Sequence, residues 1–216
     1  MSKLNLPRRG ILGAFGAASL SGCTGLDILT APPPRIFELT PKSSFPADLP
    51  QTGASIVVDV PTSSSGLNSS RIAVRPVPPS IDYYADVIWV DVVPVMIRTL
   101  IIETLENTGR IDVFSRTDLA SRADYALICH IREFQAEMQQ QAQTPLAHVR
   151  LQFRLLRMPQ RISIGSSFAD FRVPSASNAI EDVVAAHDEA LGACLKQMAV
   201  WVIETIVADQ AERGNS

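Results

Sequence analysis

Apolar and polar residues alternate along the middle of the chain. Between Val149 and Leu155 every second residue is apolar, and the residues that separate them are arginine and glutamine. A period of two is typical of a β-strand with one buried and one solvated face. The pattern predicts three strands within residues 125–173, the first over Tyr125–Met138 and the last over Ile162–Val173. Because the first is strongly apolar at its start, we expect a meander with this strand near the centre of a sheet.

Two longer segments show the period near 3.6 residues that is typical of an amphipathic helix. The first is predicted between Asp91, which can cap its start, and Gly109, which can end it, with Pro94 in the first turn. Its apolar face consists of Val93, Ile97, Leu100, Ile101 and Leu105. The second runs for about 30 residues and opens on Asn178-x-x-Glu181, which fits a capping box. Its apolar stripe consists of Ile180, Val184, His187, Leu191, Cys194, Met198 and Val202.

The first half of the chain adds shorter strands. Clusters of β-branched or aromatic residues, bounded by Pro, Ser or Gly, predict them over Arg35–Leu39, Ile56–Val60, Arg71–Arg75 and Tyr83–Trp89. The whole pattern predicts an α/β fold in a single domain. We expect a mixed, mostly antiparallel β-sheet with two long helices packed on it, preceded by an N-terminal leader.

The leader has the features of an export signal. Basic residues Lys3, Arg8 and Arg9 precede an apolar stretch over Ile11–Leu20. That stretch is far shorter than the roughly 20 residues needed to cross a bilayer. Leu20-Ser21-Gly22-Cys23 resembles a bacterial lipobox, and this likeness implies cleavage before Cys23 and acylation of that residue by chains such as palmitate. The alternatives are a secretory leader with an incidental cysteine and an uncleaved amphipathic start.

These features predict how the chain is divided. We expect a lipoprotein signal peptide over residues 1–22 and a lipidated Cys23 that opens a proline-rich spacer over residues 23–35. One domain then covers residues 36–210, and a disordered tail covers residues 211–216.

The leader also bears on location. Arg8-Arg9 looks like part of a twin-arginine signal, but the preceding Asn5-Leu6-Pro7 departs from that pattern, so general secretion and twin-arginine export both stay open. Thr24 follows Cys23 in place of the Asp that commonly retains lipoproteins in the inner membrane of enteric bacteria. We therefore expect a lipid anchor at the periplasmic face of the outer membrane, with the inner membrane as the less favoured alternative.

The charge of the chain argues against nucleic-acid binding, and its cysteines raise the question of a disulfide. Removing residues 1–22 leaves 16 Lys and Arg against 22 Asp and Glu, a net charge near −6, so no basic footprint for nucleic acid remains. Export also permits a possible disulfide between Cys129 and Cys194. The slightly favoured alternative is that both are buried and act as small apolar side chains.

Motifs for catalysis are missing from the sequence. It contains no phosphate-binding P-loop, no G-x-S-x-G nucleophile elbow and no H-E-x-x-H zinc motif. Cys129 and His130 are neighbours on one predicted strand and therefore point to opposite faces, while His130 and His148 could meet across adjacent strands. Structural roles are favoured for the histidines. We expect no catalytic residues, no metal and no cofactor, and hence not an enzyme.

Two groups of residues are candidate contacts with a partner or a lipid headgroup. The first is the basic row of Arg150 and Arg154 with His148, for which a merely solvated strand face is the more common explanation. The second is the aromatic cluster of Tyr83, Tyr84 and Trp89. For these aromatic residues core packing is the default, and a partner contact is the alternative.

Several blocks of sequence resemble a known family, the ABC-type transport auxiliary lipoproteins that accompany MCE-domain lipid transport systems. The most specific block runs from Leu67 to Trp89. The other matching segments are Ile36–Pro41, Ile56–Pro61, Ala123–Leu127, Ile131–Ala136 and the last helix with Trp201. One departure is Ile36-Phe37, where the family often has paired tyrosines.

The resemblance implies an α/β domain held at a membrane by its lipid anchor. It also implies a non-catalytic role beside an MCE-domain protein, its permease and its ATPase, in moving lipids between the inner and outer membranes. A possible homo-oligomer would match a symmetric partner. Two alternatives stay open: a periplasmic lipid carrier that binds acyl chains in its own cavity, and a hydrolase with an unrecognised site.

Overall fold

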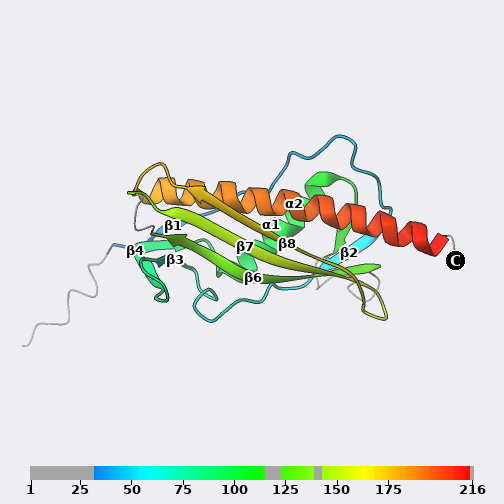
Figure 1. Ribbon diagram of the computed structural model, residues 1–216, viewed down its shortest axis with the longest axis horizontal. Helices are drawn as coiled ribbons and strands as arrows, with labels where there is room; N and C mark the ends of the chain where they lie inside the picture. The colour runs from blue at the N-terminus through cyan, green and yellow to red at the C-terminus, as the bar shows by residue number, and fades with distance from the viewer. Residues whose placement is uncertain (1–31, 115–122, 139–142, 215–216) are drawn as a thin grey trace, which may run out of the picture. The chain divides into compact units, whose positions relative to one another are not determined.

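The computed structural model describes residues 32–114, 123–138 and 143–214 (Figure 1). Helices and strands alternate irregularly along the chain. Their order is β1 (Arg35–Phe37), β2 (Ser55–Val58), β3 (Arg71–Arg75), β4 (Asp82–Trp89), α1 (Val93–Thr108), β5 (Asp112–Phe114), β6 (Tyr125–Glu137), β7 (Leu146–Arg157), β8 (Ile162–Pro174) and α2 (Ile180–Gly214).

All eight strands form one mixed sheet that is organised around β6. Along one edge, β6 pairs antiparallel with β7, which pairs antiparallel with β8. The other edge of β6 is shared, because β2 pairs in parallel with its start and β3 with its end. Strands β4 and β1 extend the sheet from β3, and β5 extends it from β2. The long strands therefore pair antiparallel, and most of the short strands pair in parallel. One mixed sheet with two helices confirms the predicted single α/β domain.

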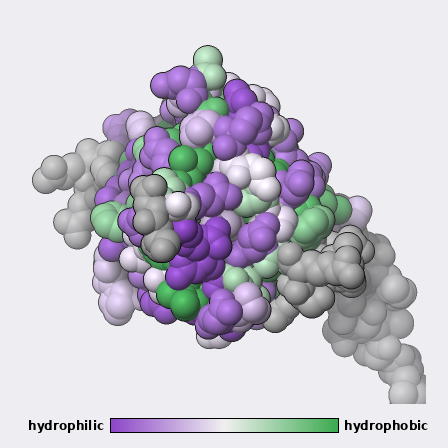
Figure 2. Space-filling view, turned by 90° about the vertical axis from the view of Figure 1, so that its right-hand side faces the viewer, coloured by the Kyte–Doolittle hydropathy of each residue, from purple (hydrophilic) through white to green (hydrophobic). Residues whose placement is uncertain are grey.

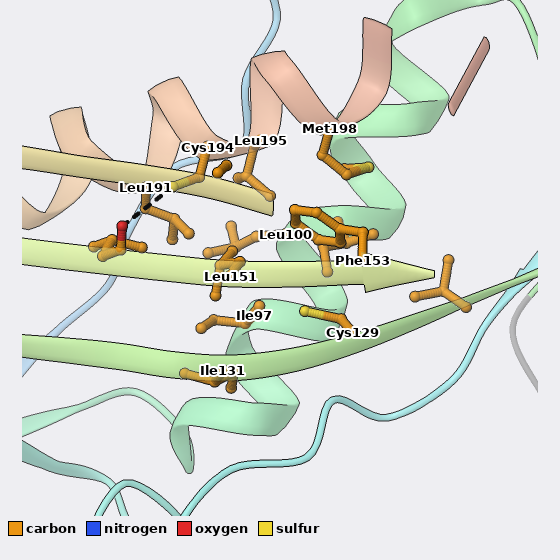
Figure 3. Close-up of a cluster of buried hydrophobic side chains, with 14 of the residues drawn as sticks. Ile97, Leu100, Cys129, Ile131, Leu151, Phe153, Leu191, Cys194, Leu195 and Met198 are labelled. Atoms are coloured by element: carbon orange, nitrogen blue, oxygen red, sulfur yellow. Dashed lines mark hydrogen bonds between the residues drawn. The ribbon is translucent and has the colours of Figure 1, made fainter. Parts of the chain in front are cut away.

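Both helices pack on the same face of this sheet. Helix α2 lies along β7 and β8 and also contacts α1 (Figure 1). Figure 3 shows how side chains from the two helices meet those of β6 and β7. The buried residues labelled there are Ile97, Leu100, Cys129, Ile131, Leu151, Phe153, Leu191, Cys194, Leu195 and Met198. The alternating strand residues and the two helical stripes predicted from the sequence therefore form one core.

The helix ends agree with the prediction only in part. Pro94 lies in the first turn of α1, and Gly109 ends the helix with a left-handed φ of 60°, as expected. Asp91 does not cap α1, because the N-cap is Val92 and the Asp91 carboxylate accepts a hydrogen bond from the Val92 N–H. The capping box at Asn178 is also wrong. The Asn178 amide donates to the Gln143 carbonyl, because the turn before α2 packs against that backbone.

The C-terminal prediction requires a correction. Helix α2 continues to Gly214, so residues 211–214 of the expected disordered tail are helical. Its last turns are held to the sheet by Asp209, whose carboxylate accepts a hydrogen bond of 2.9 Å from the Tyr125 hydroxyl and pairs with Arg157 at 2.8 Å. By length and composition α2 could cross a membrane, but half of its most apolar window is buried in the domain, as expected for a core helix.

Cys129 and Cys194 are both buried and both free, so the possible disulfide is not formed in the structure. Cys129 points inward from β6, and the Cys194 thiol lies 3.6 Å from the Val149 carbonyl, to which it donates. Burial raises the pKa of both thiols, which keeps them protonated and unreactive. The alternative role as small apolar side chains is the one that the structure shows.

Trp89 is part of the core and not a surface contact. It is 1% exposed, and its ring lies 5.8 Å from Phe134 and 5.6 Å from His187, measured between centroids. His187 Nδ1–H donates to the Val183 carbonyl one turn back along α2. Burial lowers the pKa of His187 to about 4, although this hydrogen bond acts in the opposite direction. His187 is therefore neutral in the folded protein at neutral pH.

This burial predicts that mild acid destabilises the domain through His187. In the unfolded chain a histidine titrates near pH 6.5. Between that pH and about 4, the unfolded state binds a proton that the folded state does not, so stability falls as pH falls through this window. Lowering the pH from 7 to 4.5 should reduce the free energy of unfolding of a His187→Met variant by about 2–3 kcal/mol less than that of the parent, as measured by urea unfolding. The control Phe134→Leu, which alters the same cluster without a titratable group, should retain the parent's pH dependence. Equal slopes for all three proteins would refute the prediction.

Candidate functional site

The outer face of the sheet, opposite the helices, carries most of the candidate site residues. Along β7, Arg150 and Arg154 are exposed on this face and Gln152 lies half-buried between them. His148 belongs to the same row but is only 3% exposed. The basic row predicted from the sequence is therefore limited to its two arginines, because acidic residues on the neighbouring strands cover His148.

His148 lies at the centre of a charged network that joins four strands, β3, β6, β7 and β8. Its Nδ1 is 2.9 Å from a Glu137 carboxylate oxygen on β6, and its Nε2 is 2.9 Å from Asp170 on β8. Arg75 on β3 pairs with both Glu133 and Glu137 at 2.9 Å. Burial acts to raise the pKa of Glu137, but hydrogen bonds from His148 and Gln135 and the nearby charges hold it below its usual range. The network thus favours ionised carboxylates. It also links β3, β6, β7 and β8 near the end of β6 that pairs with β3.

Three members of the network have a spacing that could hold a metal ion. One ligand atom from each of Glu133, Glu137 and His148 lies within 4.8 Å of the others. However, the Arg75 guanidinium already bridges both carboxylates, and both nitrogens of His148 already have carboxylate partners. The Arg75 guanidinium therefore balances the charge of the two carboxylates, as a metal ion would in a metal site. His130 does not join it, because His130 pairs with Gln152 across the strands and shares a hydrogen bond with Thr62.

A β-bulge in β6 creates a hollow next to this network. The register of β6 against β7 shifts between Ile131 and Glu133, so Arg132 is an extra residue. Its guanidinium turns onto the outer face and donates to the Gln152 amide oxygen, with distances of 3.1 Å from Nε and 2.6 Å from Nη2. A hollow of about 390 Å³ lies here, lined by Arg132, Glu133, Arg150, Gln152 and Phe168.

The hollow combines positive charge with an exposed ring. Arg150 contacts a carboxylate only weakly, with its Nε 3.6 Å from Asp170. Its guanidinium carbon lies 5.9 Å from the centroid of the Phe168 ring, and Phe168 is 60% exposed on β8. We name this group, Arg132, Arg150, Gln152 and Phe168, the arginine hollow. Glu133 also lines it, but its carboxylate is paired with Arg75.

The other predicted contacts do not gather at this place. Tyr83 and Tyr84 are half-buried on β4 against the core. The Tyr83 hydroxyl donates to the Gly66 carbonyl, the Arg71 guanidinium lies 3.8 Å from its ring centroid, and burial raises the pKa of Tyr84. Arg154 is exposed on β7, opposite Ile128 and Ser166, and is outside the lining of the hollow. Cys23 lies outside the described residues.

Sequence reasoning missed Arg132, Gln152 and Phe168 as parts of one site. A signal for the bulge was present, because the apolar positions of β6 change phase between Ile131 and Phe134. Inward residues lie at odd numbers before Arg132 and at even numbers after it. Such a shift of phase is typical of one inserted residue. The pairing of Phe168 with Gln152 depends on the strand register, which the sequence did not give.

Apolar residues are scattered over the end of the molecule that faces the viewer in Figure 2. Polar residues cover most of the described surface in that view, and the apolar ones lie among them. Fold and outer face together define an α/β domain whose sheet is closed by helices on one side and presents a charged surface on the other.

Comparison with known proteins identifies the family. The chain belongs to the ABC-type transport auxiliary lipoprotein components, whose family model matches residues 37–199. The resemblance found in the sequence is thereby confirmed. Members of this family are auxiliary parts of transport systems, and they are lipoproteins of the cell envelope. No curated protein matches the chain in sequence.

Solved structures share the fold. A Xanthomonas campestris protein of the DUF330 family is 25% identical, with a TM-score of 0.76, and the match covers 82% of this chain and 98% of that one. An uncharacterised protein is 10% identical, with a TM-score of 0.61 and coverage of 81% and 99%. The second likeness shows the fold alone.

The charged network predicts an unequal response to removing two arginines. Arg75→Met should lower the free energy of unfolding by about 1–3 kcal/mol, because two half-buried carboxylates lose their shared cation. Arg35→Met is the matched control, since its ion pair with Glu181 is exposed to solvent and its loss should cost clearly less than the loss of Arg75. Urea unfolding at pH 7 measures both. If the two substitutions lower the free energy of unfolding equally, the network does not stabilise the pairing of β3 with β6.

Proposed function

We propose that this chain is a non-catalytic, membrane-anchored periplasmic subunit of an MCE-type ABC transport system that moves lipids between the inner and outer membranes. The observation that carries the proposal is the family match, which spans nearly the whole described domain. The open sheet face supports it, because an auxiliary subunit needs surface for contact. Its partners would be the MCE-domain protein, the permease and the ATPase.

The packed core favours a docking subunit over a lipid carrier. A carrier needs an internal cavity for acyl chains, but among the described residues the space between the sheet and the helices is filled by side chains such as Ile97, Leu151 and Leu195, each fully buried. The hollows described, of about 310 to 530 Å³, open to the surface. Close packing of this kind leaves no room for a lipid tail in that interior.

The anchor gives a physical reason for weak docking to suffice. A lipidated Cys23 would hold the domain at the membrane, and the prolines at positions 32–34 would act as a stiff, extended spacer. Tethering raises the effective concentration of the domain near a partner in the same envelope. Thr24 after Cys23 supports the outer membrane as the site of the anchor. In this proposal the domain positions the outer end of the lipid conduit.

The anchor predicts that acylation depends on one cysteine. A Cys23→Ala variant, expressed in a Gram-negative host with radiolabelled palmitate, should incorporate no label. Cys129→Ala and Cys194→Ala are matched controls, because both thiols are buried in the folded domain and neither should affect labelling. Gel autoradiography after immunoprecipitation makes the measurement. Label in Cys23→Ala at the parent level would remove the anchor from the proposal.

The proposal also predicts a specific set of neighbours in the envelope. A photo-crosslinking amino acid placed in turn at Ile36, Val90 and Arg154, which are exposed, should capture the MCE-domain protein from at least one position. The parent protein without a photo-crosslinking residue is the control and should capture nothing. Mass spectrometry identifies the crosslinked protein. Capture of none of the three transporter components at any of these positions would contradict the proposed subunit role.

A further inference from the structure

The arginine hollow is more positive than its surroundings. Neither Nε nor Nη2 of Arg132 has a carboxylate partner in the described structure, because both donate to the neutral Gln152 amide oxygen. Arg150 has only the 3.6 Å contact with Asp170, and Asp170 also faces His148 and Arg172. Glu133, the one acidic residue in the lining, is neutralised by Arg75. Two guanidinium groups thus share a hollow in a protein whose mature charge is near −6.

The donors converge on one place. The Gln152 amide oxygen is used by Arg132, which leaves its NH₂ group to donate, and Gln152 lines the hollow together with its cross-strand neighbour Phe168. The bulge puts Arg132 and Glu133 next to each other on the outer face, because the outward positions of β6 change there from even to odd numbers. Planar guanidinium groups with several N–H donors are suited to an anion that has several oxygens.

We propose that the arginine hollow binds the phosphate group of a phospholipid, with Arg132, Arg150 and the Gln152 NH₂ group donating to its oxygens. A phosphate offers more acceptor oxygens than a carboxylate and can therefore satisfy three donors together. The hollow, at about 390 Å³, has room for a headgroup but not for acyl chains. The chains lie outside it, along the exposed ring of Phe168.

Phe168 is the reason to assign a lipid in place of a free phosphate. A ring that is 60% exposed beside two arginines gives a ligand an apolar contact directly next to its anion. Inorganic phosphate or glycerol phosphate would use the arginines and leave the ring unused. The choice of lipid rests on the proposed role in lipid movement, whereas the choice of phosphate rests on the hollow itself.

Binding measurements on the full-length lipoprotein in dodecyl maltoside test this inference. Native mass spectrometry counts bound phosphatidylglycerol or diacylglycerol, and calorimetry measures binding of sn-glycerol 3-phosphate. We expect one phosphatidylglycerol per chain and no diacylglycerol. Arg132→Gln and Arg150→Gln should each weaken phosphatidylglycerol binding at least about tenfold. Arg154→Gln is the matched control, because it removes the same charge from the same strand face outside the hollow, and it should change binding less than about twofold.

Phe168→Ser distinguishes the two sources of phosphate. It should weaken phosphatidylglycerol binding about tenfold and leave the weaker binding of glycerol 3-phosphate unchanged. Absence of phosphatidylglycerol binding, or equal weakening by Arg150→Gln and Arg154→Gln, would overturn the proposed site. Glycerol 3-phosphate that binds as tightly as the lipid, with no effect of Phe168→Ser, would overturn the lipid assignment. Crosslinking to the transporter is a separate measurement, so failure of the hollow and failure of the proposed subunit role can be told apart.

Discussion

Burial of one face of the sheet beneath α1 and α2 is the constraint on which the rest of the structure depends. Strand β6 is hydrogen-bonded along both edges, and its inward side chains Cys129, Ile131 and Phe134 are almost completely buried. Truncating a buried side chain such as Ile or Phe typically costs about 2–5 kcal/mol, a large part of the stability of a domain of this size. Because side chains alternate along a strand, closing one face places the remaining residues on the other face.

That second face is where charge can be arranged without disturbing the core. The bulge at Arg132 shows how the two faces are connected. It lets inward positions change from odd to even numbers, which keeps Phe134 in the core, and it puts Arg132 and Glu133 next to each other on the outer face. A packing requirement and the proposed binding surface thus meet at the same inserted residue. The network around His148 joins the adjoining strands where β3 meets β6, so the hollow lies beside a region that is hydrogen-bonded across several strands.

The sequence predicted the regular elements well where their period was long. The three strands of the meander and the stripe on α2 extend over enough residues for alternation or helical spacing to be clear, and the structure confirms them. Shorter features were less predictable. Strand β5 has three residues and was missed, and Asn178 was assigned a capping role that its side chain does not have. Local patterns compete with tertiary contacts, and in short segments the contacts decide.

The chain by itself determined the class of protein: the resemblance in its blocks, the alternation of β7 and the lipobox-like leader are properties of consecutive residues. Only the tertiary structure decided which polar residues act together. Arg132, Gln152 and Phe168 come from three strands, and their meeting depends on register. His148 and Trp89 were both candidates for the surface, yet both are buried because neighbouring elements cover them. Exposure and proximity are set by pairing between distant segments, which a pattern along one segment does not contain.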